Sequence, residues 1–115
     1  MSGKIEITAD KNGPVCILCF KGDVTSLSDE AINAAYAALD LGEKPRLVID
    51  FTETRYINSA GIATLVGMVS SMTKKKGTLR FAGMAPHYRR VAQIVGITDY
   101  VAFYDTVADA LADPA

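Results

Sequence analysis

The side chains in this sequence that could do chemistry are few, and the cysteines are the first of them. Cys16 and Cys19 stand three residues apart in an apolar run, a spacing that zinc and redox sites also use. No second cysteine pair accompanies them in the sequence, and side chains three apart on a strand point to opposite faces. We therefore interpret both thiols as buried packing groups, and the sequence predicts no metal site.

Asp50 and His87 are the candidates for acid–base catalysis. Asp50 ends an apolar run, and sites in α/β proteins lie at strand ends, so Asp50 is the best placed general base. His87 is the only histidine, and neither residue has a nucleophile or metal-ligating partner at a recognisable spacing. The sequence also lacks both common glycine-rich phosphate loops. We expect no enzymatic activity and no cofactor; a small enzyme using Asp50 or His87 is the alternative that a deep polar pocket would favour.

The segment 56–62, Tyr-Ile-Asn-Ser-Ala-Gly-Ile, contains a serine hydroxyl that could be functional. One interpretation is structural: Asn58 or Ser59 caps the helix that follows, which contributes about 1 kcal/mol. The other is that Ser59 is phosphorylated. A phosphate carries nearly two negative charges, and the free amides and dipole of a helix start would accept it without refolding the domain. Ala60 and Gly61 leave room for a kinase or a partner protein.

A phosphate on Ser59 would also act on a bound partner. A desolvated anion stranded in a protein interface costs several kcal/mol, which is enough to turn binding off. On the helix that follows, we expect the exposed side to carry Ala60, Gly61, Thr64, Gly67, Met68 and Ser71. Gly67 costs about 1 kcal/mol relative to alanine inside a helix, so either a partner approaches closely there or Gly67 packs against a neighbouring strand.

The elements that position this segment follow from hydrophobic periodicity and turn residues. The sequence predicts strands over 5–9, 15–20, 47–51, 78–82 and 101–104, and helices over 26–39, 59–75, 87–95 and 106–111. Strands that alternate with helices favour right-handed crossovers and a parallel sheet. We therefore predict an α/β fold with a mixed, mostly parallel sheet of four to five strands and about four helices, in which the first strand is antiparallel. The expected core is Val15, Ile17, Leu47, Ile49, Leu65, Val66, Val69, Leu79 and Phe81.

Composition limits the remaining classes of function. With 115 residues, half of them hydrophobic, the chain fits a single domain over 1–115. Its 12 basic and 13 acidic residues give no electrostatic footprint for nucleic acid or a membrane surface. We interpret the lysine run 74–76 as a solvated helix end. No apolar run approaches the roughly 20 residues of a membrane span, and free thiols without a signal peptide indicate the cytoplasm.

Several of these segments together resemble the STAS domain, in particular the bacterial anti-sigma factor antagonists. The resemblance covers nearly the whole chain and rests on an ordered set of matches: 22–23, 47–51, 56–61, Leu65, Gly77, Leu79, Phe81, Arg90, Val91, Ile94, Gly96 and Ile97. It implies a protein that binds an anti-sigma factor, which is also a serine kinase, and so frees the sigma factor. It further implies that the kinase phosphorylates Ser59 to release the antagonist, and that a PP2C-type phosphatase resets it.

The sequence departs from the family pattern at two positions beside the implied phosphorylation site. The acid that precedes the serine is Asn58 here, and a second acid, two residues after Asp23, is Thr25. Fewer negative charges should make a phosphate at Ser59 easier to accommodate. The implied partner surface consists of Asp23, Thr25, Asn58, Ser59, Ala60, Gly61, Thr64, Gly67 and Met68. The alternative function is a STAS adaptor or scaffold subunit of a transporter ATPase or larger signalling complex, without phospho-switching.

Overall fold

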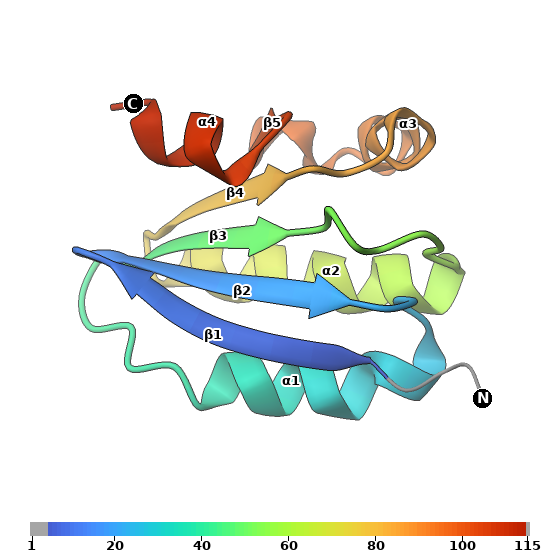
Figure 1. Ribbon diagram of the computed structural model, residues 1–115, viewed down its shortest axis with the longest axis horizontal. Helices are drawn as coiled ribbons and strands as arrows, with labels where there is room; N and C mark the ends of the chain where they lie inside the picture. Colours follow the sequence, from blue (N-terminus) through green and yellow to red (C-terminus); the bar gives the residue numbers. More distant parts are fainter. Residues whose placement is uncertain (1–4, 115) are drawn as a thin grey trace.

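The computed structural model describes residues 5–114 and contains one five-stranded sheet with helices on both faces (Figure 1). The strands are β1 (Glu6–Asn12), β2 (Val15–Lys21), β3 (Arg46–Asp50), β4 (Thr78–Ala82) and β5 (Val101–Tyr104). The helices are α1 (Asp29–Ala37), α2 (Ser59–Lys74), α3 (Pro86–Ile94) and α4 (Val107–Ala112), with 3₁₀ turns η1 (Ser26–Ser28) and η2 (Ile97–Asp99).

The sheet has the order β1-β2-β3-β4-β5, which confirms the mixed, mostly parallel α/β architecture. β1 and β2 form an antiparallel hairpin, and every later neighbour pairs in parallel. The hairpin closes through Gly13 and Pro14, and Gly13 has a φ of +60°, a conformation that glycine adopts without steric cost. Because β2, β3, β4 and β5 run the same way, their carboxyl ends meet at one edge of the sheet (Figure 1).

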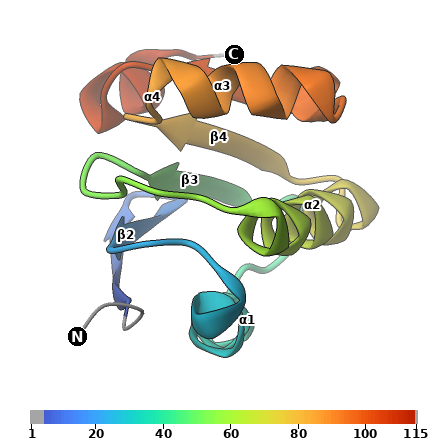
Figure 2. The ribbon, with the colours of Figure 1, turned by 90° about the vertical axis from the view of Figure 1, so that its right-hand side faces the viewer.

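Successive residues of β3 point to opposite faces, and both faces are covered (Figure 2). Leu47 and Ile49 belong to the main core, which α1, α2 and α3 cover. Val48 belongs to a second, smaller cluster with Ala82 and with Ala110 of α4. The burial of both faces explains why the strand reads as a continuous apolar run.

Four phenylalanine rings form a row through the main core. Phe20, Phe51, Phe81 and Phe103 contact one another in sequence, edge to face, with ring centroids 5.5, 5.0 and 5.6 Å apart. Edge-to-face contacts of this kind add stabilisation beyond the apolar area they bury. The row therefore ties β2, β4 and β5 to the chain leaving β3.

The expected core differs from the observed one at three positions. Val66 was expected inward but is 38% exposed on α2. Val15 and Ile17 are half-buried, because their side chains meet the short helix α4 rather than the main helical layer. The other expected members, Leu47, Ile49, Leu65, Val69, Leu79 and Phe81, are buried.

Two elements, β1 and α1, differ from expectation by more than one residue at a boundary. β1 extends to Asn12, because it pairs with the whole length of β2. The helix expected from Ser26 starts instead as the 3₁₀ turn η1, and α1 proper begins at Asp29.

Among the described helices, none has the length and apolar character to cross a lipid bilayer.

Candidate functional site

Ser59 is the first residue of α2, and its side chain is exposed. The cap is Asn58, whose backbone is extended and whose Oδ1 accepts a hydrogen bond of 2.9 Å from the Gly61 amide. Within residues 5–114 the Ser59 hydroxyl makes no hydrogen bond. Of the two caps that the sequence allowed, the structure therefore uses Asn58 and leaves the Ser59 oxygen accessible.

The loop before α2 is fixed to the segment that follows β2. Val24 and Ile57 form an isolated parallel bridge. The Val24 amide donates to the Tyr56 carbonyl at 2.9 Å, and the Asn58 amide donates to the Val24 carbonyl at 3.1 Å. This pairing places Asp23 and Thr25, which flank Val24 in the chain, beside the start of α2.

Gly61 allows these two segments to approach each other. A Cβ atom at residue 61 would lie 2.1 Å from the Val24 carbonyl oxygen, a distance that real Cβ atoms essentially never show. Glycine is therefore required where α2 passes the backbone of Val24. The small residue after Ser59 and Ala60 has a packing role that the sequence alone did not reveal.

Thr25 uses its hydroxyl in a cap of its own. Thr25 Oγ1 accepts from the Leu27 amide at 3.1 Å, while Ser28 Oγ accepts from the Thr25 amide at 2.8 Å and donates to the Thr25 carbonyl at 2.9 Å. Ser28 is completely buried, and sequence reasoning did not single it out. A serine three residues after a threonine is a recognisable form of the reciprocal capping pattern. Thr25 thus orders η1 next to Ser59.

The expected exposed side of α2 is wrong for three residues. Gly61, Thr64 and Met68 are buried, whereas Ala60 and Ser71 are half-buried and Gly67 is exposed. The backbone of Val24 covers Gly61, and Met68 belongs to the main core. α1 covers Thr64, whose Oγ1 donates to Asp29 Oδ1 at 2.5 Å. The two helices also meet through a second hydrogen bond, in which Tyr36 Oη and Ser71 Oγ lie 2.8 Å apart.

Gly67 does not pack against a strand, so that interpretation of it is also wrong. No atom lies within 4 Å of the position that its Cβ would take. Gly67 instead lines a shallow hollow between α1 and α2, with Ser26, Asp29, Asn33, Ala60, Ala63 and Thr64. The hollow reaches the start of α2, where Ala60, the residue after Ser59, lines it.

Asp50 has a local structural role at the end of β3. Its Oδ1 accepts from the Thr52 amide at 3.0 Å and from Thr52 Oγ1 at 2.5 Å, which fixes the turn that follows. Its Oδ2 accepts a weak hydrogen bond of 3.6 Å from Cys19 Sγ. Burial and the nearby Asp50 carboxylate raise the pKa of the Cys19 thiol, so Cys19 is held as the thiol.

The other candidates for chemistry lie apart from one another. Cys16 is buried in the main core, and Cys19 lies on the α4 face, so the two free thiols point to opposite sides of the sheet. His87 is exposed near the start of α3, where its ring contacts Tyr88 edge to face. Within residues 5–114 no group of three or more His, Cys, Asp and Glu side chains is arranged to hold a metal ion.

Comparison with known proteins connects this geometry to a family. The family model described as the STAS domain matches residues 6–110. A Bordetella bronchiseptica protein, BtrV, named as a candidate anti-sigma factor antagonist, is 33% identical over 93 residues, which cover 80% of this chain and 79% of BtrV. An anti-sigma factor antagonist from Mycobacterium paratuberculosis shares the fold with a TM-score of 0.80, 23% identity and 96% of each chain covered.

A second similar structure is that of a phosphorylated protein. The Bacillus cell fate determinant SpoIIAA in its phosphorylated form matches with a TM-score of 0.71 at 15% identity, covering 92% of this chain and 96% of SpoIIAA. At this identity the likeness concerns the fold alone.

Proposed function

This chain belongs to the STAS domain family, and from that premise we propose that it is an anti-sigma factor antagonist controlled by phosphorylation of Ser59. Unphosphorylated, it would bind an anti-sigma factor that is also a serine kinase, and thereby free the sigma factor. Phosphorylation would release the kinase, and a PP2C-type phosphatase would restore the binding form. We place this cycle in the cytoplasm.

The observation that supports the proposal most directly is the free hydroxyl of Ser59. Because Asn58 takes the helix cap, Ser59 Oγ stays exposed and unbonded among the described residues. A kinase can therefore reach it without unfolding the start of α2. In the transfer, Ser59 Oγ forms a bond to the γ-phosphorus of ATP, the bond to ADP breaks, and the hydroxyl proton passes to a base on the kinase.

The site can accommodate the product of that transfer. The positive end of the α2 dipole favours an anion at this position, and the first amides of the helix remain available apart from that of Gly61, which Asn58 holds. Asn58 and Thr25 are neutral, so less negative charge opposes the phosphate than acids at these two positions would. The domain would therefore switch its surface charge while its fold stays the same.

The proposed partner surface is centred on Ser59. Its exposed or half-exposed members are Asp23, Thr25, Asn58, Ser59, Ala60 and Gly67. Gly61, Thr64 and Met68 lie beneath this surface and shape it through their contacts with Val24, α1 and the core. Asp23 and Asp29 give the surface a negative character, which fits a partner that presents basic side chains.

The test is a kinase and binding assay with each anti-sigma factor kinase of the source genome. With ATP, one of them should add a single phosphoryl group to the wild type, detected by intact mass and mapped to Ser59. Ser59→Ala should bind that kinase and gain no mass, while Ser59→Asp should bind at least tenfold more weakly.

The matched control is Ser70→Ala, which removes another exposed hydroxyl of α2 farther along the helix. It should be phosphorylated and bound like the wild type. Phosphorylation at a residue other than Ser59, or equal binding by Ser59→Asp and the wild type, would contradict the proposed switch.

A further inference from the structure

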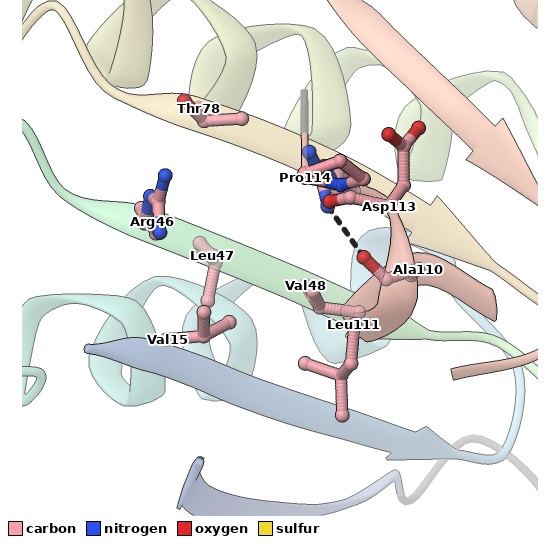
Figure 3. Close-up of a pocket in the computed structure, with 10 residues that line it drawn as sticks. Val15, Arg46, Leu47, Val48, Thr78, Ala110, Leu111, Asp113 and Pro114 are labelled. Carbon is pink, nitrogen blue, oxygen red and sulfur yellow. Dashed lines mark hydrogen bonds between the residues drawn. The ribbon is translucent and has the colours of Figure 1, made fainter. Parts of the chain in front are cut away.

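A small hollow lies at the end of the sheet opposite Ser59, and the proposed antagonist function does not use it. It is enclosed between α4 and the starting residues of β2, β3 and β4 (Figure 3), and its volume is about 120 Å³. An engineered protein cavity of about 150 Å³ holds benzene, so this hollow has room for a carbon chain of about four atoms.

Each side of the hollow carries an apolar side chain, Val15 from the sheet and Leu111 from α4. Val15, Arg46 and Thr78 stand directly opposite one another in β2, β3 and β4, so their side chains share one face of the sheet. It is the α4 face, because Val48, two residues after Arg46, packs against Ala110. Leu111 closes the hollow from the helix side.

The rim of the hollow carries positive charge. Arg46 is exposed and forms no hydrogen bond or ion pair with the described part of the chain. Arg80 lies deeper, where one of its guanidinium nitrogens donates to the Ala110 carbonyl at 2.5 Å and to the Asp113 carbonyl at 2.8 Å. Asp113 supplies the one carboxylate among the lining residues, and Tyr104 Oη donates to that carboxylate.

We propose that this hollow binds a small organic carboxylate. The carboxylate pairs with the Arg46 guanidinium, which can donate two parallel hydrogen bonds, and accepts a third from Thr78 Oγ1. The short carbon chain lies between Val15 and Leu111. Since the ligand contacts both the sheet and α4, its binding holds that helix in place.

Butanoate is the probe, and the readout is the amide NMR spectrum of the intact chain during titration. We expect saturable shifts at the lining residues with a dissociation constant on the order of 1 mM, a reasonable affinity for a ligand of about six non-hydrogen atoms. Saturation at ten times that constant should slow amide exchange in α4 about tenfold, because the ligand must leave before the helix opens. Neutral 1-butanol and inorganic phosphate should bind at least tenfold more weakly.

Variants of two exposed cationic residues distinguish specific binding in the hollow from non-specific attraction of anions to positive charge. Arg46→Gln should weaken butanoate binding at least tenfold. Lys74→Gln removes the same charge at the end of α2, outside the hollow, and should leave the affinity unchanged. The proposal is overturned if butanoate gives no saturable shifts, if 1-butanol or phosphate binds as well, or if both variants behave alike.

Discussion

Asn58 and Ser59 are neighbours with separate tasks. The Asn58 amide oxygen holds the Gly61 N–H, and the Ser59 hydroxyl is left to solvent. If Ser59 were the cap, phosphorylation would change the group on which the helix start depends. With the cap on Asn58, the start of α2 keeps its hydrogen bond whether or not Ser59 is modified.

This division of tasks predicts the effect of changing Asn58. Asn58→Ala removes the cap and should lower the free energy of unfolding by about 1 kcal/mol in urea denaturation. Asn58→Asp keeps an oxygen acceptor in place and should unfold like the wild type. Wild-type stability in Asn58→Ala would show that the cap hydrogen bond contributes nothing.

At this scale the sequence could predict the exposed hydroxyl but not its surroundings. A serine followed by alanine and glycine at the start of a helical pattern indicates an open helix start. The choice between Asn58 and Ser59 as cap depends on one backbone conformation. The close approach of Val24 to Gly61 depends on a segment more than thirty residues away, which no local pattern reports.

α2 contains two glycines in opposite environments. At Gly61 the backbone of Val24 occupies the space that a Cβ would need, whereas at Gly67 that space is open. A glycine in a helix costs about 1 kcal/mol relative to alanine when nothing else requires it. Packing therefore requires glycine at position 61, whereas Gly67 lowers the stability of the helix with no packing reason.

The same substitution should have opposite effects at the two positions. Gly61→Ala should lower the free energy of unfolding by about 1–3 kcal/mol, because the added methyl group meets a backbone carbonyl that cannot move independently. Gly67→Ala should raise it by up to about 1 kcal/mol. Both changes are measurable by urea denaturation, and equal effects at the two sites would contradict the observed packing.

Elements with a strong periodic pattern were predictable, and their exposed sides were less so. The boundaries of β4 and β5 match expectation, and α2 ends within one residue of it. The predictions for Val66 and Met68 were wrong because apolar residues occupy a wide arc of α2. The sequence pattern therefore fits two orientations of the helix about its axis almost equally well. The contact with α1 through Thr64 decides between them.

On the scale of the whole molecule, the sheet is covered unequally. Three helices cover the main core, while the six-residue α4 covers the opposite face. Polar contacts compensate for the small size of α4: Arg80 donates to two carbonyls at its end, and Tyr104 Oη donates to the Asp113 carboxylate. The sequence predicted this helix but not the face on which it would pack, because six residues carry too little pattern.

The contacts of α4 predict a dependence on alkaline pH. The hydrogen bond to Asp113, together with burial, raises the pKa of Tyr104 above its ordinary value. A raised value means that the folded state favours the neutral phenol. Its contribution to stability is complete below the ordinary pKa of about 10 and is lost as the pH rises through the higher folded value.

Absorbance titration of tyrosinate checks this prediction. Tyr104→Phe should remove a component that ionises above the ordinary tyrosine value of about 10. The stability difference between the wild type and Tyr104→Phe should also shrink as the pH rises above about 10. Loss of an early-ionising component from Tyr104→Phe would contradict the observed hydrogen bond.

The row of phenylalanine rings has a consequence for spectroscopy. The chain has four phenylalanines, five tyrosines and no tryptophan, and all four phenylalanines belong to the row. Phenylalanine fine structure in near-ultraviolet circular dichroism therefore reports on the main core, while tyrosine signals come from residues that are half-buried or exposed. Without adding a label, one spectrum can distinguish loosening of the surface from melting of the interior.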